Sequence, residues 1–331
     1  MKGSDSLDVE RKVIAILRIL KESTEPLGAR IVSRRLDDYG IDLTERAVRY
    51  HLKLMDERGL TQAIGRDGRL ITPSGVEELN NALVGDKVGF VINRIELMAF
   101  RTTFDWETRS GSVPVNISLF SQRKFPQALK AIRNACKAGI CVSELVAIAE
   151  EGEQIGETVV PPGKVGLATV CSIVINGALL KAGIPADSRF GGILQIRNRE
   201  PLRFVELIQY SGSSLDPSTV FIRGKMTSVC EVARKGNGKI LANFREIPAQ
   251  CRPVAEQVIT KLKEARIGGL VVMGNNSEPV CELPVEQNRV GIVLLGGLNP
   301  VAAAEEAGVE TESISMSSAI DYKQLRSIWE L

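Results

Sequence analysis

Hydrophobic residues recur at helical spacing along the N-terminal part of the chain. Residues 8–22 place Val13, Ile16 and Leu20 on one face, with charged residues between them, which predicts an amphipathic helix. A second apolar set over residues 29–38 predicts a shorter helix. The chain therefore begins with a unit built from packed helices.

A third helix, TERAVRYHLKLMDERG, has two different faces. Thr44 is a suitable N-cap, and Gly59 ends the helix. At about 100° per residue, Val48, Leu52 and Met55 fall on one side and form a core face. The other side is basic and carries an aromatic ring, which suits contacts with phosphates and guanine edges in the major groove of DNA. Its members are Arg46, Arg49, Tyr50 and Lys53.

A hairpin signal follows the third helix. Two short strand-like runs flank Gly65-Arg66-Asp67-Gly68, and Asp-Gly is a strong turn signal. Helices followed by a basic hairpin predict a winged helix-turn-helix over residues 1–83, and His51 is assigned to packing or phosphate contact. The candidate DNA-binding residues are Arg34, Arg46, Arg49, Tyr50, Lys53, Arg66 and Arg69.

The C-terminal two thirds of the chain contain an internal repeat. VGLATVCSIVINGALLKAGI, residues 165–184, matches VGIVLLGGLNPVAAAEEAGV, residues 290–309, at an offset of 125 positions. The same offset relates Gly111 to Gly236, each of which precedes a strand-like run. We therefore predict an α/β multidomain protein whose regulatory domain, residues 84–331, is duplicated, with helices covering sheets and a cleft between two lobes. The repeats lie at about 94–214 and 215–331.

Glycine-rich turns are the candidate ligand sites of this domain. Glycine lets a backbone approach a ligand, and free N–H groups at a helix start favour anions. None of these turns matches a P-loop or a Rossmann fingerprint. The alignment of positions 171 and 172 with 296 and 297 suggests a pocket shared by the two repeats. The candidate effector-binding residues are Gly163, Lys164, Gly166, Thr169, Cys171, Ser172, Arg189, Gly191, Gly192, Gly296, Gly297 and Asn299.

Composition narrows the function further. The net charge is only +2, so any interaction with DNA depends on where the charges lie. Six cysteines show neither CxxC pairing nor the density of a disulfide scaffold, and we interpret most as buried hydrophobes. No apolar stretch is long enough to span a membrane and the N-terminus is too polar for a secretory signal, which predicts a cytoplasmic protein. We expect no catalytic residue, metal site or cofactor.

The whole chain resembles the NrpR nitrogen regulatory repressors of archaea and some bacteria. The resemblance rests on TERAVRYHLKLMDERGL in the winged helix and on two glycine-rich segments, VVPPGKVGLATVCSIVINGALLKAGIPADSRFGGILQ and VGIVLLGGLNPVAAAEEAG. It covers roughly residues 8–325. The winged helix also resembles those named after ribonuclease R, which does not imply nuclease activity.

The resemblance implies a mechanism. Members of the family bind operators of nitrogen-assimilation genes as dimers and release them when 2-oxoglutarate accumulates, and this chain carries one copy of the sensory domain. We therefore expect a homodimer on a palindromic operator in double-stranded DNA, with 2-oxoglutarate as candidate allosteric effector. As a dianion, it suits Lys164, Arg189 and the amides of the glycine turns.

Two other functions fit parts of the sequence. The α/β unit could be an enzyme that the winged helix targets to DNA, with Cys171 as the nucleophile to examine, and a depressed thiol pKa there would favour it. The winged helix could instead be an RNA- or protein-interaction module in a chain without a small ligand, and binding only to single strands would favour that function.

Overall fold

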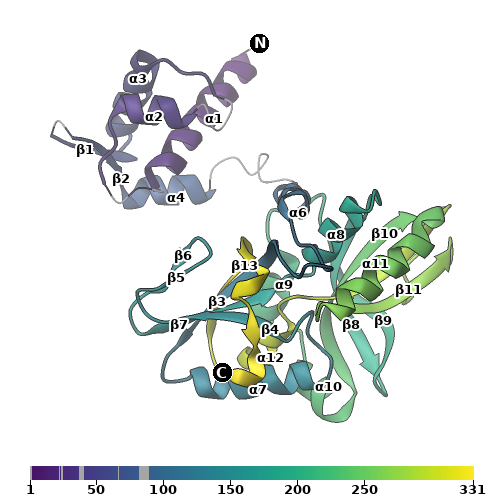
Figure 1. Cartoon of the computed structure of the whole chain (residues 1–331). Coiled ribbons are helices and arrows are strands. Elements are labelled where there is room, and N and C mark those ends of the chain that lie inside the picture. Colours follow the sequence, from purple (N-terminus) through teal and green to yellow (C-terminus); the bar gives the residue numbers. More distant parts are fainter. Residues whose placement is uncertain (1, 22, 24, 37–40, 66, 82–88) are drawn as a thin grey trace. The chain divides into compact units, whose positions relative to one another are not determined.

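The structure is a computed structural model that describes residues 2–21, 23, 25–36, 41–65, 67–81 and 89–331 (Figure 1). The chain divides into two compact units, residues 1–87 and 88–331. The boundary expected from the sequence, at 83–84, lies outside the described residues. Among the helices described, none has the length and apolar composition that crossing a membrane requires.

The N-terminal unit is a winged helix. Its elements are α1 (Lys2–Lys21), α2 (Ala29–Leu36), α3 (Glu45–Glu57), β1 (Thr61–Ile64), β2 (Gly68–Ile71) and α4 (Pro73–Asn81). Leu17, Leu52 and Met55 are completely buried in the core that α1, α2 and α3 share. Gly68 has a φ of +131°, and a Cβ there would lie 2.3 Å from the carbonyl carbon of Leu27. Only glycine therefore lets β2 lie against the chain entering α2.

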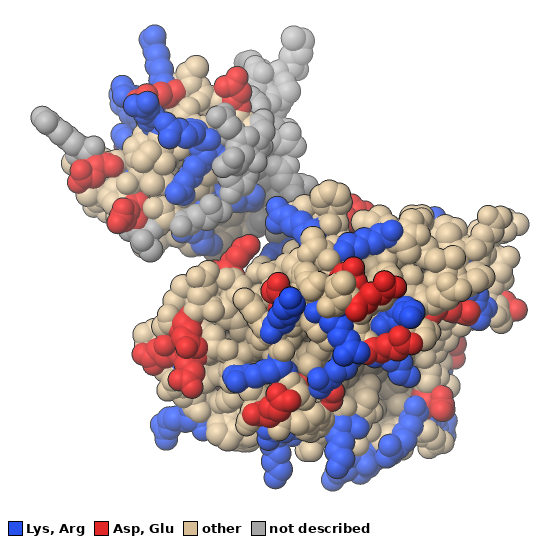
Figure 2. All heavy atoms as spheres, viewed as in Figure 1, with Lys and Arg blue, Asp and Glu red and all other residues tan. Residues whose placement is uncertain are grey.

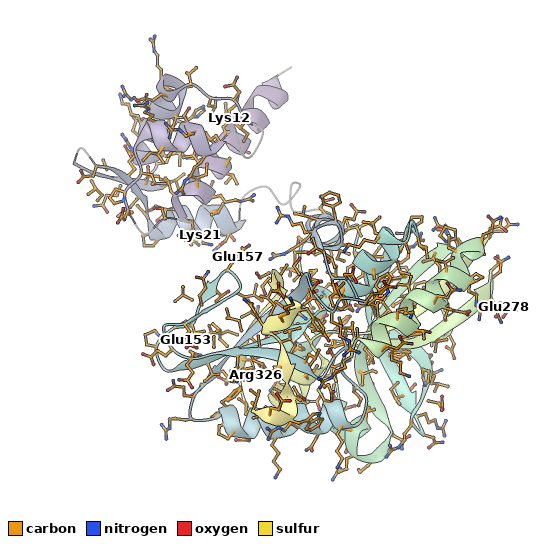
Figure 3. The ribbon with its side chains drawn as sticks, in the orientation of Figure 1. Lys12, Lys21, Glu153, Glu157, Glu278 and Arg326 are labelled. Carbon is orange, nitrogen blue, oxygen red and sulfur yellow. The ribbon has the colours of Figure 1, made fainter. Side chains whose placement is uncertain are left out.

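The C-terminal unit contains two copies of one structural repeat. The first copy comprises α6 (Phe90–Arg101), β3 (Ser112–Ser121), α7 (Phe125–Lys137), β4 (Leu145–Ala149), β5 (Gln154–Ile155), β6 (Thr158–Val159), β7 (Lys164–Val170), α8 (Ile173–Lys181) and β8 (Asp187–Arg197). After β9 (Glu200–Gln209) and α9 (Pro217–Arg223), the second comprises α10 (Val229–Lys235), β10 (Gly238–Pro248), α11 (Arg252–Glu264), β11 (Leu270–Asn276), β12 (Arg289–Leu295), α12 (Asn299–Glu306) and β13 (Thr311–Asp321). In the small hairpin β5–β6, Glu153 directly precedes β5 and Glu157 lies between the two strands; both residues are labelled in Figure 3.

The two sheets exchange their last strands. One sheet has the order β13-β3-β7-β4-β14, where β14 is Arg326–Ser327, and the other has the order β11-β12-β10-β8-β9. The first sheet therefore combines three strands of the first copy with β13 of the second, while β8 of the first copy lies beside β10 of the second. The predicted duplication of an α/β domain is confirmed, but the sheets do not follow the boundary between the repeats.

The helices follow the same exchange. α7 packs against α12 and α10, whereas α8 packs against α6 and α11. Figure 1 shows the first group along the lower side of the unit and the second group at its upper right. Because each group mixes helices from both copies, the copies share one continuous hydrophobic core rather than forming two separable lobes.

Candidate functional site

The predicted recognition helix has the expected polarity. The Thr44 side chain accepts a hydrogen bond from the backbone N–H of Ala47, which caps α3. On the outer face, Tyr50 is 63% exposed, and Arg46, Arg49 and Lys53 are also exposed. Figure 2 shows lysine and arginine side chains gathered over α2 and α3. This face can therefore offer cations and a ring to a polyanion without loss of core packing.

The remaining DNA-binding candidates differ in their surroundings. Arg34 lies exposed on α2. Arg69 is partly buried on β2, and its Nε donates to Asp56 of α3 over 2.8 Å, so it ties the wing to the helix. Arg66 lies outside the described residues. His51 is 7% exposed, with its ring centroid 5.8 Å from that of Tyr50, which is a packing position.

One part of the glycine-rich segment lies at the outer end of β7. The N–H of Gly163 donates to the carboxylate of Glu151 over 2.7 Å, and Lys164 forms an ion pair with Glu312 over 3.1 Å. Gly166 packs closely, because a Cβ there would lie 2.9 Å from Val160. These three candidates stabilise local structure and do not line the cavity described below.

The candidates on β8 and at the start of α12 also have structural partners. Arg189 forms ion pairs with Asp187 and Glu286 over 3.2 and 2.6 Å. Asn299 is completely buried, and its amide exchanges two hydrogen bonds with the backbone of Leu241. The remaining glycines allow close packing of neighbouring residues. They are Gly191, Gly192 and Gly296.

A small cavity lies where β7 and β12 lead into α8 and α12. Its volume is about 30 Å³. Cys171, Ser172 and Gly297 line it, so the structure brings these three predicted residues together across the two copies. Thr169 lies beside them and donates to the carbonyl of Gly297 over 3.3 Å. Sequence analysis missed most of the polar lining, namely Asn116, Tyr210, Asp216, Ser218, Asn243, Arg245 and Ser315.

Arg245 is the main charge in this cavity. It lies on β10, is only 2% exposed, and donates to the carbonyl and hydroxyl oxygens of Ser172, each over 3.2 Å. Its Nε has no hydrogen-bond partner, and among the described residues no carboxylate lies within 4.0 Å of the guanidinium. Burial lowers the pKa of Arg245 to about 10, so it stays positive at neutral pH. A buried cation without a counter-charge is costly, and a bound anion would remove that cost.

Two asparagines occupy equivalent positions in the copies. Asn116 pairs with Thr169 on β7 and Asn243 pairs with Leu294 on β12, and Leu294 lies 125 positions after Thr169. The amide of Asn243 donates to Ser172 over 3.0 Å and accepts from Tyr210 over 2.6 Å. By contrast, Nδ2 of Asn116 is buried without a partner. Together with Nε of Arg245, it leaves two unused donors at the cavity, which is the arrangement an oxyanion requires.

Cys171 does not have the environment of a nucleophile. It is 6% exposed, and burial raises its pKa to about 11. A thiol in this state is almost entirely protonated at neutral pH and reacts slowly. Cys171 therefore lacks the depressed thiol pKa that would have favoured an enzyme. Among the described residues, no cluster of His, Cys, Asp and Glu is suited to a metal ion.

Comparison with known proteins identifies the family. A model described as NrpR regulatory domains NRD1 and 2 matches residues 88–327, which is most of the chain. The chain belongs to the NrpR family. Residues 14–79 match a second model, described as the ribonuclease R winged-helix domain. NrpR proteins are nitrogen regulators rather than enzymes, in agreement with the function expected from the sequence.

Individual NrpR relatives agree along nearly the whole chain. It is 45% identical to the global nitrogen regulator NrpRI of Methanosarcina mazei over 320 residues, covering 97% of this chain and 98% of the relative. It is 32% identical to the global nitrogen regulator NrpR of Methanococcus maripaludis over 98% of this chain, but only 55% of that relative. A crystal structure of a nitrogen repressor-like protein from Methanococcus jannaschii superposes with a TM-score of 0.62 at 26% identity, covering 72% of this chain and 98% of that one.

Proposed function

We propose that this NrpR-type DNA-binding regulator is a repressor of nitrogen-assimilation genes that leaves its operator when a small anion binds at Arg245. The observation that carries the proposal is the buried guanidinium of Arg245, which lacks a carboxylate partner among the described residues. A carboxylate would supply the missing charge and accept from Nε, and such charge-assisted hydrogen bonds are the strong ones. The candidate effector is 2-oxoglutarate, and the pocket residues proposed to face it are Asn116, Cys171, Ser172, Arg245 and Gly297.

On the DNA side, we infer a homodimer that places two α3 helices in successive major grooves of a palindromic operator. The exposed Arg46, Arg49, Tyr50 and Lys53 support this arrangement, with Arg34 and the wing beside the phosphates. We place the change from the DNA-binding to the effector-binding domain near residues 83–84. As a regulator of genes, the protein would act in the cytoplasm.

The effector would act by favouring one arrangement of the dimer over another. A ligand shifts such an equilibrium only by its difference in affinity for the two states, typically about 1–3 kcal/mol. The cavity touches both copies of the repeat, because Ser172 belongs to the first and Arg245 and Gly297 to the second. Filling it therefore changes contacts within the shared core.

The test is a titration of the full-length protein with 2-oxoglutarate, with succinate and glutamate as controls. Calorimetry gives the affinity, and release from a palindromic promoter fragment at fixed salt gives the response. We expect Arg245→Met to weaken 2-oxoglutarate binding by about 100-fold or more, since Arg245 is the only cationic side chain among the described residues that line the cavity. Its melting temperature should not fall, because an unpaired buried charge is replaced by an apolar chain.

The matched control is Ser118→Ala. Ser118 pairs with Leu167 on β7 as Arg245 pairs with Ile292 on β12, so the two are equivalent positions in the copies. Ser118 bonds to Ser313 and lies outside the cavity lining, and its loss should leave effector affinity unchanged. Equal 2-oxoglutarate binding by wild type and Arg245→Met, or tight DNA binding that ignores all three acids, would contradict the proposal.

A further inference from the structure

The cavity at Arg245 is too small for the whole proposed effector. Its volume of about 30 Å³ is close to that of a single water molecule. 2-Oxoglutarate has two carboxylates at opposite ends of a carbon chain, so one end can enter while the rest needs space outside. The surroundings of the cavity therefore decide where the second carboxylate lies.

A larger groove adjoins the cavity. Its volume is about 470 Å³, and it shares Asp216, Ser315 and Met316 with the lining of the cavity. Apolar side chains from α6, α9, β13 and the segment before α9 form its walls. They are Val91, Leu215, Val220 and Ile314.

Two arginines supply positive charge in this groove. Arg94 extends from the middle of α6, and Arg223 is the last residue of α9 and is exposed. Within the described part of the chain, neither guanidinium lies within 4.0 Å of a carboxylate, so neither charge is neutralised by an ion pair. Both charges remain available to an anion in the groove.

The shared wall between cavity and groove is a bulge in β13. Pairing of β13 with β3 is interrupted between Ile314 and Ser318, and Met316 inside the bulge has a φ of +50°, a strained value for a non-glycine residue. The N–H of Met316 donates to Asn116 on the cavity side over 2.9 Å. Its carbonyl accepts from Nε of Arg94 on the groove side, also over 2.9 Å. The wall is thus held by one residue from each compartment.

We propose that the groove is the subsite for the second carboxylate of the effector, which Arg94 and Arg223 bind while the first carboxylate lies at Arg245. This proposal rests on the proposed function and adds the place of the second carboxylate, on the groove side of Met316, and the two arginines that bind it. A monocarboxylate would fill only the inner cavity. Arg94 belongs to α6, which among the described helices of the regulatory unit is the nearest in sequence to the winged-helix unit, so an anion in the groove contacts that helix.

Asp216 lies in the wall and has to tolerate a nearby anion. Burial raises the pKa of its carboxyl, which favours the neutral form. The same carboxyl accepts hydrogen bonds from the N–H and hydroxyl of Thr219 at the start of α9, so it has a fixed orientation. A raised pKa reduces the free-energy cost of protonating this carboxyl when an anion binds beside it.

The test compares two keto acids that differ only at one end. 2-Oxoglutarate carries the second carboxylate, and 2-oxobutyrate carries a hydrogen atom in its place, so that its chain ends in a methyl group. Calorimetry on the full-length protein should show that Arg223→Gln weakens 2-oxoglutarate binding by about tenfold and leaves 2-oxobutyrate within about twofold of wild type. Arg94→Gln should show the same selective loss.

The matched control is Arg326→Gln, which removes an exposed arginine on β14, outside the groove (Figure 3). It should change neither affinity, which separates the local effect from the change in net charge. If Arg223→Gln and Arg94→Gln weaken both acids equally, or weaken neither, the groove is not the subsite. If wild type binds 2-oxobutyrate and 2-oxoglutarate with equal affinity, the second carboxylate contributes nothing, and the subsite proposal is wrong while the proposed function stands. If wild type binds neither acid, the proposed function itself fails.

Discussion

The two copies of the regulatory repeat have the same order of elements but different residues where they meet. Asn116 and Asn243 are equivalent, whereas Ser118 corresponds to Arg245 and Ser172 corresponds to Gly297. Tyr210 and Asp216 come from the segment between β8 and α10, which joins the two copies. The elements that follow β13, at the end of the second copy, include no counterpart of this segment. Equivalent strands thus support a cavity to which the two copies contribute different side chains, with the cation Arg245 on the second copy.

The largest expected effect separates the two equivalent asparagines. Asn243→Leu should lower the free energy of unfolding by about 3 kcal/mol, because it leaves the buried hydroxyl of Tyr210 without its acceptor and removes one of the two donors to the hydroxyl of Ser172. Asn116→Leu should cost about 1 kcal/mol, since its Nδ2 is already unpartnered and only the bond from Met316 is lost. Urea unfolding without ligand measures both, and equal losses would show that the two positions do not differ as described.

A second change makes the copies more alike. In Gly297→Ser, the new Cβ would lie 2.6 Å from Nδ2 of Asn116 and 3.2 Å from Cα of Cys171, inside the cavity. We expect effector affinity to fall by about 30-fold, or about 2 kcal/mol, because the added atoms take the space of the ligand. The control is Gly212→Ala, at an exposed turn outside the cavity lining, where no atom lies within 4 Å of the added Cβ and φ is not positive. Unchanged effector binding by Gly297→Ser would place the ligand elsewhere.

A third test uses the pKa of Cys171. Its folded-state pKa of about 11 lies above the ordinary thiol value of 9.0, so the thiol's contribution to stability is complete below pH 9 and is lost as the pH rises through 11. Between pH 9 and 11, wild type should therefore lose about 1–2 kcal/mol more stability than Cys171→Ala, as measured by urea unfolding. Parallel curves for the two proteins would mean that the side chain at the start of α8 is not buried in the protein in solution.

The smallest expected effect concerns the winged helix, which lies outside both copies of the regulatory repeat. Lys53 is exposed, and among the described residues its only ion pair is with Glu57 over 4.0 Å. Lys53→Gln should therefore leave folding intact and weaken operator binding about threefold to tenfold. The slope of log affinity against log salt should become shallower by about one unit. Titration with 2-oxoglutarate should be unaffected, and a changed effector affinity would contradict the separation of the two surfaces.

Much of the fold could be predicted from local sequence patterns. The winged helix follows from helical periodicity, the Thr44 cap and the Asp-Gly turn, all of which act over a few residues. The repeat was visible because β7 and β12, like α8 and α12, keep the same spacing of 125 positions. Cys171, Ser172 and Gly297 were placed together for that reason.

The rest of the site depends on long-range contacts. Arg245 interrupts an apolar strand, KILANFREIP, and a charge there carries no local sign of what it faces. Its position against Ser172 follows from the exchange of strands between the copies, which pattern analysis of each copy cannot detect. The alternation of Asn243 and Arg245 on one face of a buried strand was the available signal. Conversely, Gly163 and Lys164 share a motif with the cavity residues but lie at the other end of β7. Arg189 follows Ser188, which pairs with Arg245, but its guanidinium forms ion pairs with Asp187 and Glu286 and does not line the cavity.

The exchange of strands also affects the order in which a newly made chain can fold. Ser118 of β3 pairs with Ser313 of β13, which the ribosome adds 195 residues later, so this part of the sheet cannot form before then. At a typical rate of 5–20 residues per second, this delay is about 10–40 s on the ribosome. During that time the winged helix, whose strands are adjacent in sequence, can already be complete, while β3 has an open edge exposed to other nascent chains. Synthesis therefore yields the DNA-binding unit well before the part that controls it.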